Sequence, residues 1–99
     1  MIIRVDRTGP SLLEPEDCKR FHVEVVDLPA GPGALLDALG AWADGGDDTH
    51  VWIRIDAVRA AATGRVAATW DADFDGMVAF AGSKGWLDAA GTAIRAHVA

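Results

Sequence analysis

Short runs of alternating apolar and polar residues constrain the fold of this chain more than any other feature. Side chains of a strand point alternately to the two faces of a sheet, so each run predicts a strand with one apolar face. The alternation predicts strands over residues 2–6, 20–27, 50–55 and 92–98. In one common phase, the apolar positions are Ile3, Val5, Phe21, Val23, Val25, Val51, Ile53, Ile55, Ile94, Ala96 and Val98.

All three histidines fall on the opposite phase of this alternation. If the four strands join one sheet in phase, the side chains of this phase gather on one surface, which we call the polar face. The first two strands contribute Arg4, Asp6, His22 and Glu24, and the last two contribute His50, Trp52, Arg54, Arg95 and His97. The polar face is therefore the candidate functional surface.

Apolar residues three and four positions apart predict a first helix after the second strand. It opens at residues 30–33, where Pro32 suits the first helical position because its missing N–H needs no partner there. Gly45 and Gly46 end it. The apolar stripe of this helix consists of Leu35, Leu36, Leu39 and Trp42.

Two further helices are predicted in the second half of the chain. One covers residues 57–63, with Asp56 as its N-cap, and the other covers residues 72–84. Residues 8–19 and 65–70 lack a clear period and predict loops. The stripe of the last helix consists of Phe74, Met77, Val78 and Ala81.

The order of these elements predicts an α/β (α+β) fold, a two-layer sandwich. In it a four-stranded mixed sheet carries two to three helices packed on one face. At 99 residues the chain is long enough for one domain, residues 1–99, with one core. The polar face is then bare in the monomer, and only solvent covers it unless a ligand, a partner or a second copy does.

Charge and cysteine content exclude some classes of partner. Fifteen acidic and nine basic residues give a net charge of −6, which disfavours nucleic acid. No run approaches the roughly 18 apolar residues of a membrane span, and the N-terminus lacks a signal-peptide pattern. Because Cys18 is the only cysteine, no intramolecular disulfide forms. We therefore expect an acidic cytoplasmic protein.

The polar face holds residue types suited to proton transfer and to binding. The candidates for general acid–base catalysis are His22, Glu24, His50 and His97. The candidates for contacts with a ligand or partner are Trp52, Arg54 and Arg95, the indole for stacking and the guanidinium groups for anions. The alternative is that all of them form the wet side of an ordinary sheet.

Two patterns resemble metal sites. His22-Val23-Glu24 with a third histidine has the spacing H-x-E…H, but the chain has too few strands for a barrel that would shield such a site. Residues 71–76 match D-x-D-x-D-G, the start of a calcium loop, yet Gly82 stands at the twelfth place, where a bidentate acid is needed. An acidic first turn of the last helix explains these aspartates. We predict no metal and no cofactor.

Other motifs have ordinary structural interpretations. Gly31-Pro32-Gly33 is typical of a turn, because it lacks both the glycine spacing and the lysine of a phosphate loop. Cys18 is interpreted as a lone surface thiol, although its basic neighbours could favour a thiolate. The remaining indoles, interpreted as anchors at or near the core, are Trp42, Trp70 and Trp86.

These observations favour a small non-catalytic binding or accessory protein. We expect it to pair with a protein partner or with itself, as a homodimer, through the polar face around Trp52. The alternative is a cofactor-free enzyme for a small anionic or aromatic substrate, with histidine and glutamate transferring protons and arginine anchoring the substrate under a second subunit. A third interpretation is an acidic protein that neutralises a basic partner. Strand order, oligomeric state and the identity of any ligand stay open.

Overall fold

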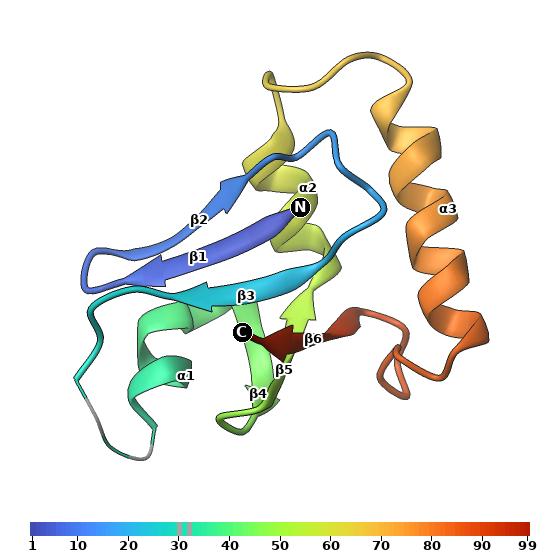
Figure 1. The fold of residues 1–99 in the computed structure, drawn as a ribbon. Coiled ribbons are helices and arrows are strands. Elements are labelled where there is room, and N and C mark those ends of the chain that lie inside the picture. Colours follow the sequence, from blue (N-terminus) through green and yellow to red (C-terminus); the bar gives the residue numbers. More distant parts are fainter. Residues whose placement is uncertain (30, 32) are drawn as a thin grey trace.

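A computed structural model describes residues 1–29, 31 and 33–99 (Figure 1). The predicted opening of the first helix at Ala30 and Pro32 lies outside the described residues. The described helices are α1 (Ala34–Leu39), the 3-10 helix η1 (Gly40–Trp42), α2 (Ile55–Ala62) and α3 (Trp70–Ser83). The described strands are β1 (Ile2–Asp6), β2 (Gly9–Leu13), β3 (His22–Val25), β4 (Ala43–Gly46), β5 (His50–Arg54) and β6 (Ala93–Val98).

The strands form one mixed sheet in the order β2-β1-β3-β6-β5-β4. Neighbours β1–β3 and β3–β6 are parallel, and β1–β2, β5–β6 and β4–β5 are antiparallel. The mixed α+β class with helices packed on the sheet is confirmed. The predicted number of four strands is wrong, because the described sheet has six strands, and it curls into a half-barrel.

The predicted loop over residues 8–19 contains β2. It pairs with β1 through a turn at Arg7 and Thr8, in which Asp6 Oδ1 accepts a hydrogen bond from the Thr8 backbone N–H (2.8 Å). Pro10 lies opposite Val5. Because β2 is the first strand of the sheet, its outer edge needs no backbone donor, and an edge strand tolerates proline. Gly9 and Pro10 are therefore compatible with a strand at this position, and the predicted loop is wrong over residues 9–13.

The second missed strand, β4, contains the glycines that were expected to end the first helix. The helix instead ends at Leu39, and the chain passes through η1 into β4, which pairs with β5. Gly46 has a φ of 134°, and a Cβ there would lie 2.4 Å from the carbonyl oxygen of His50. Glycine thus allows a close approach of two backbones at a bulge rather than a helix stop.

The boundaries of the other elements also shift. Ile55 opens α2 rather than closing a strand, and Arg54 stands at the N-cap position without a side-chain cap bond. Asp56, the predicted N-cap, lies in the first turn of α2, where its carboxylate binds the Arg54 side chain. β3 is shorter than the predicted strand 20–27, which leaves Phe21 just before it.

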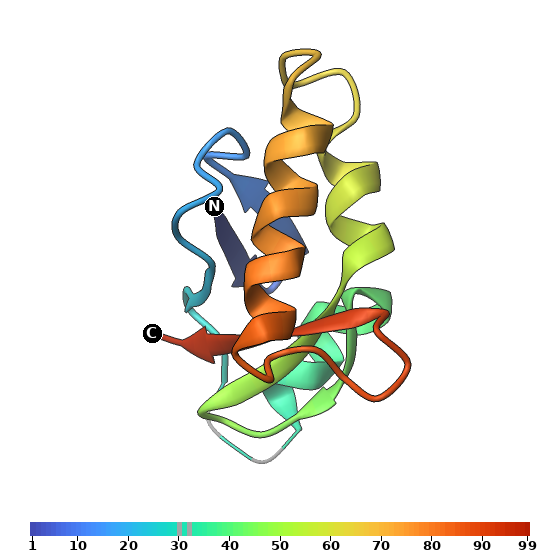
Figure 2. The ribbon, with the colours of Figure 1, turned by 90° about the vertical axis from the view of Figure 1, so that its right-hand side faces the viewer.

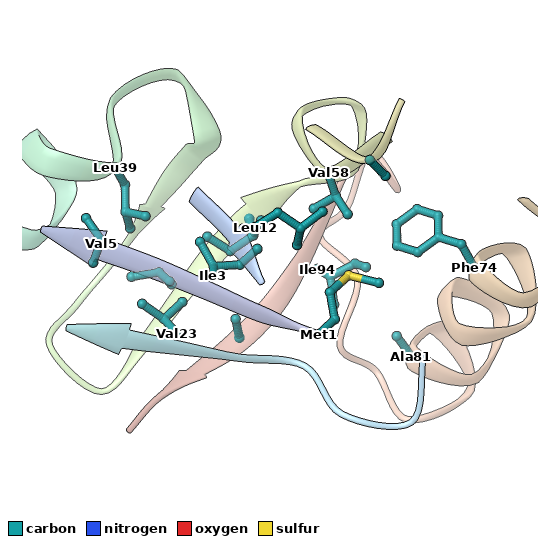
Figure 3. Close-up of a cluster of buried hydrophobic side chains, with 14 of the residues drawn as sticks. Met1, Ile3, Val5, Leu12, Val23, Leu39, Val58, Phe74, Ala81 and Ile94 are labelled. Carbon is teal, nitrogen blue, oxygen red and sulfur yellow. The ribbon is translucent and has the colours of Figure 1, made fainter. Parts of the chain in front are cut away.

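The buried apolar side chains form a cluster between the sheet and the helices (Figure 3). The predicted inward positions Ile3, Val5 and Val23 are fully buried in it, and Phe74 joins them from α3. Helix α3 follows the prediction closely, since residues 71–76 form its first turns. No helix among the described residues is long and apolar enough to cross a membrane.

Helix α3 stands off the end of the sheet at which β1 and β6 begin (Figure 1). Figure 2 shows α2 beside it, and Arg59 of α2 pairs with Asp71 and Asp75 of α3. Trp70, as predicted, is an anchor: it is buried, stacks on Phe74 with ring centroids 4.7 Å apart, and donates a hydrogen bond to the carbonyl oxygen of Pro15. These contacts set the position of α3 relative to the sheet.

Candidate functional site

The four strands that carry the predicted polar face are neighbours, in the order β1, β3, β6, β5. His22 of β3 pairs with His97 of β6, and His97 pairs with His50 of β5. Paired residues of adjacent strands point to the same face of a sheet, so the three imidazoles form one row, which we call the histidine row. The prediction that they share a face is confirmed. Their role stays a prediction.

His50 and His97 are the closest members of the row. Their rings meet edge to face, with centroids 5.6 Å apart. Because Thr49 and Val98 are joined by a backbone hydrogen bond (2.9 Å), the histidines next to them occupy a non-hydrogen-bonded pair, where antiparallel side chains lie nearest. Among the described residues, no three His, Cys, Asp or Glu side chains are grouped to hold a metal ion. We assign no metal to the row.

A tight turn fixes the chain just before His50. Asp47 Oδ1 accepts hydrogen bonds from the backbone N–H groups of Thr49 (2.8 Å) and His50 (2.9 Å), and from the Thr49 hydroxyl (2.7 Å). The Thr49 hydroxyl and these backbone donors favour the carboxylate, and they lower the pKa of Asp47 from 3.8 to about 2. The start of β5 is thus held by an ionised side chain at neutral pH.

Glu24 lies on one side of the histidine row, and Arg95 lies on the other. Glu24 follows His22 on β3 and pairs with Arg4 of β1. Arg95 precedes His97 on β6, in the direction away from Glu24, and pairs with Trp52 of β5. A histidine and glutamate pair for proton transfer is therefore separated from the arginine that was expected to anchor the same substrate.

The Arg54 guanidinium is already occupied by carboxylates. It binds Asp56 through Nε (3.0 Å) and Nη2 (2.9 Å), and both carboxylate oxygens of Asp44 through Nη1 (3.1 Å each). The hydrogen bonds of Asp56 and then of Asp44 raise the pKa of Arg54. Arg54 therefore ties β5 to β4 and α2, and this geometry leaves Arg95 as the better placed anchor for an anion.

A cleft opens beside β6 where this strand changes its partner. The end of β6 pairs with β3, and the Ala99 backbone N–H donates a hydrogen bond to the carbonyl oxygen of Val23 (2.8 Å). Earlier on the same edge of β6, the Arg95 backbone N–H donates to the carbonyl oxygen of Trp86 (2.8 Å), so the segment around Trp86 takes the place of β3. The chain leading into β3, the first half of β6 and α3 surround the resulting cleft of about 670 Å³. Figure 1 shows these segments on the side where α3 stands. We call it the α3 cleft.

One part of the α3 cleft is apolar and largely aromatic. Phe80 and Trp86 meet edge to face with ring centroids 5.9 Å apart, and Phe80 is 55% exposed. An exposed phenylalanine is notable because burial of an aromatic ring is strongly favourable. The apolar side chains that line the cleft are Phe21, Met77, Phe80, Ala81, Trp86 and Ile94.

The other part of the lining consists of basic and histidine side chains. It consists of Lys19, Arg20, His50, Arg95 and His97, and among the described residues no aspartate or glutamate lines the cleft. Arg20 is 4.0 Å from Asp17, an exposed ion pair that solvent weakens. In a chain with a net charge of −6, this lining concentrates positive charge next to an aromatic surface.

Cys18 also lines the cleft and is half-buried. Burial raises the pKa of its thiol, and Asp73 raises it further, so the basic neighbours do not produce a thiolate. The sequence predicts a lone surface thiol, and in the structure this thiol is only partly exposed.

Sequence reasoning found part of the cleft and missed the rest. The sequence predicts His50, His97 and Arg95 as candidates, whereas it predicts Trp86 only as an anchor at or near the core and assigns no role to Phe80. Phe80 lies off the apolar stripe predicted for α3, and an aromatic residue on the outer side of an amphipathic helix was the available signal. Trp52 is half-buried on the polar face, but it is outside the lining of the α3 cleft.

No protein-family model matches the chain, and no significant match was found among curated proteins or solved structures. Function therefore has to be inferred from the geometry and charge of the site itself.

Proposed function

We propose that this protein binds a small organic molecule in the α3 cleft and acts as a non-catalytic binding or accessory protein. The observation that carries the proposal is the cleft itself, about 670 Å³ with aromatic side chains on one side and a few polar groups on the other. Sites for small ligands have this size and composition, mostly apolar with a small number of polar groups that orient the ligand.

A cofactor-free enzyme is the second candidate, because His50 and His97 line the cleft and their rings are in contact. Imidazole is the side chain best suited to proton transfer near neutral pH. Chemical turnover of a bound ligand, followed by mass spectrometry and lost on His97→Gln, would favour this candidate over simple binding.

Gly76 offers a direct test of the proposed site. It lines the cleft from α3 with ordinary helical backbone, and a Cβ there meets no atom within 4 Å. Gly76→Phe therefore fills the cleft without backbone strain, and we expect it to weaken binding of the neutral fluorescent probe phenylnaphthylamine by about tenfold or more.

Gly76→Ala is the matched control. It changes the same position but adds only a methyl group, and it should keep probe binding while stabilising the helix by about 0.5–1 kcal/mol. Folding of both variants is checked by circular dichroism. Equal probe affinity in the unmodified protein and a folded Gly76→Phe variant would contradict the proposal.

Association through the polar face and a cytoplasmic location belong to the same proposal. Trp52 supports the first, since a half-buried indole opposite Arg95 on a sheet face is a typical anchor of protein interfaces. The lone cysteine supports the second.

A further inference from the structure

We propose that the natural ligand of the α3 cleft is a small aromatic anion, an aromatic body that carries a carboxylate or a phosphate. This inference rests on the proposed function and adds the chemical class and orientation of the ligand.

The first observation is that some basic side chains have no carboxylate as an ion-pair partner. Arg4, Arg7, Arg54 and Arg59 each lie within 4.0 Å of an aspartate. Lys19 and Arg95 have no such ion pair among the described residues, and both line the cleft. Outside the cleft, these four arginines are thus paired with the chain's own acids, and Arg65 binds the carbonyl oxygens of Leu12 and Ala61 instead. Within the lining, Lys19 and Arg95 are left to meet an anion from outside.

The second observation is how firmly Arg95 is placed. Its strand is paired with β5 on one edge, and its own backbone N–H bonds to Trp86 on the other. His97 lies two residues further along the same face, with His50 beside it. A guanidinium and two imidazoles on paired strands, with their backbones fixed in the sheet, offer several N–H donors to the oxygens of one anionic group.

The third observation is where the aromatic surface lies relative to this charge. Trp86 is bonded to Arg95 through the backbone and contacts Phe80 of α3. A ligand that stacks its ring on these two side chains therefore brings a substituent toward Arg95. Lys84 adds to the positive potential near this surface, since its Nζ is 5.5 Å from the centroid of Phe80. The ring is held by the aromatic side chains, and the anionic group is held by β6.

The test compares anionic ligands with neutral ligands that keep the same naphthyl ring. Naphthoate and naphthyl phosphate carry the anion, naphthamide and naphthol are their neutral counterparts, and binding is measured by calorimetry at low and high salt. We expect at least one anion to bind about tenfold more tightly than its neutral counterpart, with the difference reduced by salt. Which of the two anions binds more tightly distinguishes a carboxylate ligand from a phosphate ligand.

Arg95→Gln should remove the preference for the anion and leave the affinity for naphthamide unchanged. Arg4→Gln is the matched control, because Arg4 lies on the same sheet face but outside the lining of the cleft. Lys19→Gln, in the loop before β3, provides a second variant should Arg95→Gln fail to fold.

The two proposals fail in different ways. Suppose that charged and neutral ligands bind equally well and that Gly76→Phe blocks both. This result would overturn the inference that the ligand is an anion, and it would keep the cleft as a binding site. An unchanged preference for the anion in folded Arg95→Gln and Lys19→Gln would also overturn that inference. Absence of binding by every one of these aromatic ligands would overturn both.

Discussion

At the scale of single residues, Asp47 shows how one exposed carboxylate sets the position of a candidate site residue. Its three hydrogen bonds to Thr49 and His50 hold the chain just where β5 begins. Because the pKa is lowered to about 2 in the folded protein, the ionised form is the one that stabilises the fold. That contribution is complete above the unfolded value of 3.8 and is lost as pH falls through about 2.

Asp47→Ala should therefore lower Tm at neutral pH and flatten the dependence of stability on pH between these two values. The two proteins should converge in their response to acid once the native carboxyl is protonated. Thermal unfolding followed by circular dichroism across this range measures the effect. Asp48→Ala is the control, because among the described residues the Asp48 side chain makes none of these bonds. An identical acid response of the two variants would count against the assignment.

At the scale of elements, the two missed strands have the same cause. β2 contains Gly9 and Pro10, and β4 contains Gly45 and Gly46, residues that punctuate a sequence when it is read locally. On the outer edge of a sheet, however, no strand partner needs the N–H that proline lacks. At a bulge, glycine permits two backbones to come close together. These are effects of neighbouring strands, which periodicity within one segment cannot reveal.

Gly46→Ala should destabilise the protein by about 2 kcal/mol or more, since both the positive φ and the contact with His50 oppose a methyl group. Gly45→Ala is a matched control, with a φ of 131° but no atom within 4 Å of the added Cβ. It should cost only the conformational part, about 1 kcal/mol. Urea unfolding gives both values. Equal losses would show that the close approach carries no free energy.

At the scale of the whole molecule, the polar face followed from the sequence and the cleft did not. The alternation in four strands was enough to put His22, His50 and His97 on one face, because the phase of a strand is a local property. The cleft depends on where β6 exchanges β3 for the segment around Trp86, and on α3 standing beside that exchange. Both depend on packing between segments far apart in the chain.

The predicted self-association also belongs to this scale. Light scattering should give twice the 10.4 kDa mass of the chain, and Trp52→Ala should return the single-chain mass, because removing an indole anchor from an interface typically costs about 2 kcal/mol or more. Arg4→Ala, at the other end of the same face, should keep the mass of the unmodified protein. A single-chain mass for the unmodified protein at every concentration would contradict the prediction.

Along one edge, β6 pairs first with the segment around Trp86 and then with β3, and this arrangement matters for redesign of the binding site. Most of the residues that line the α3 cleft lie between residues 76 and 97, on α3, β6 and the segment that joins them, and the rest come mainly from the short connection ahead of β3. The parallel pairs of the sheet contribute few of them. Libraries restricted to positions 77, 80 and 86 would therefore alter the shape and selectivity of the binding site while the scaffold beneath it stays the same.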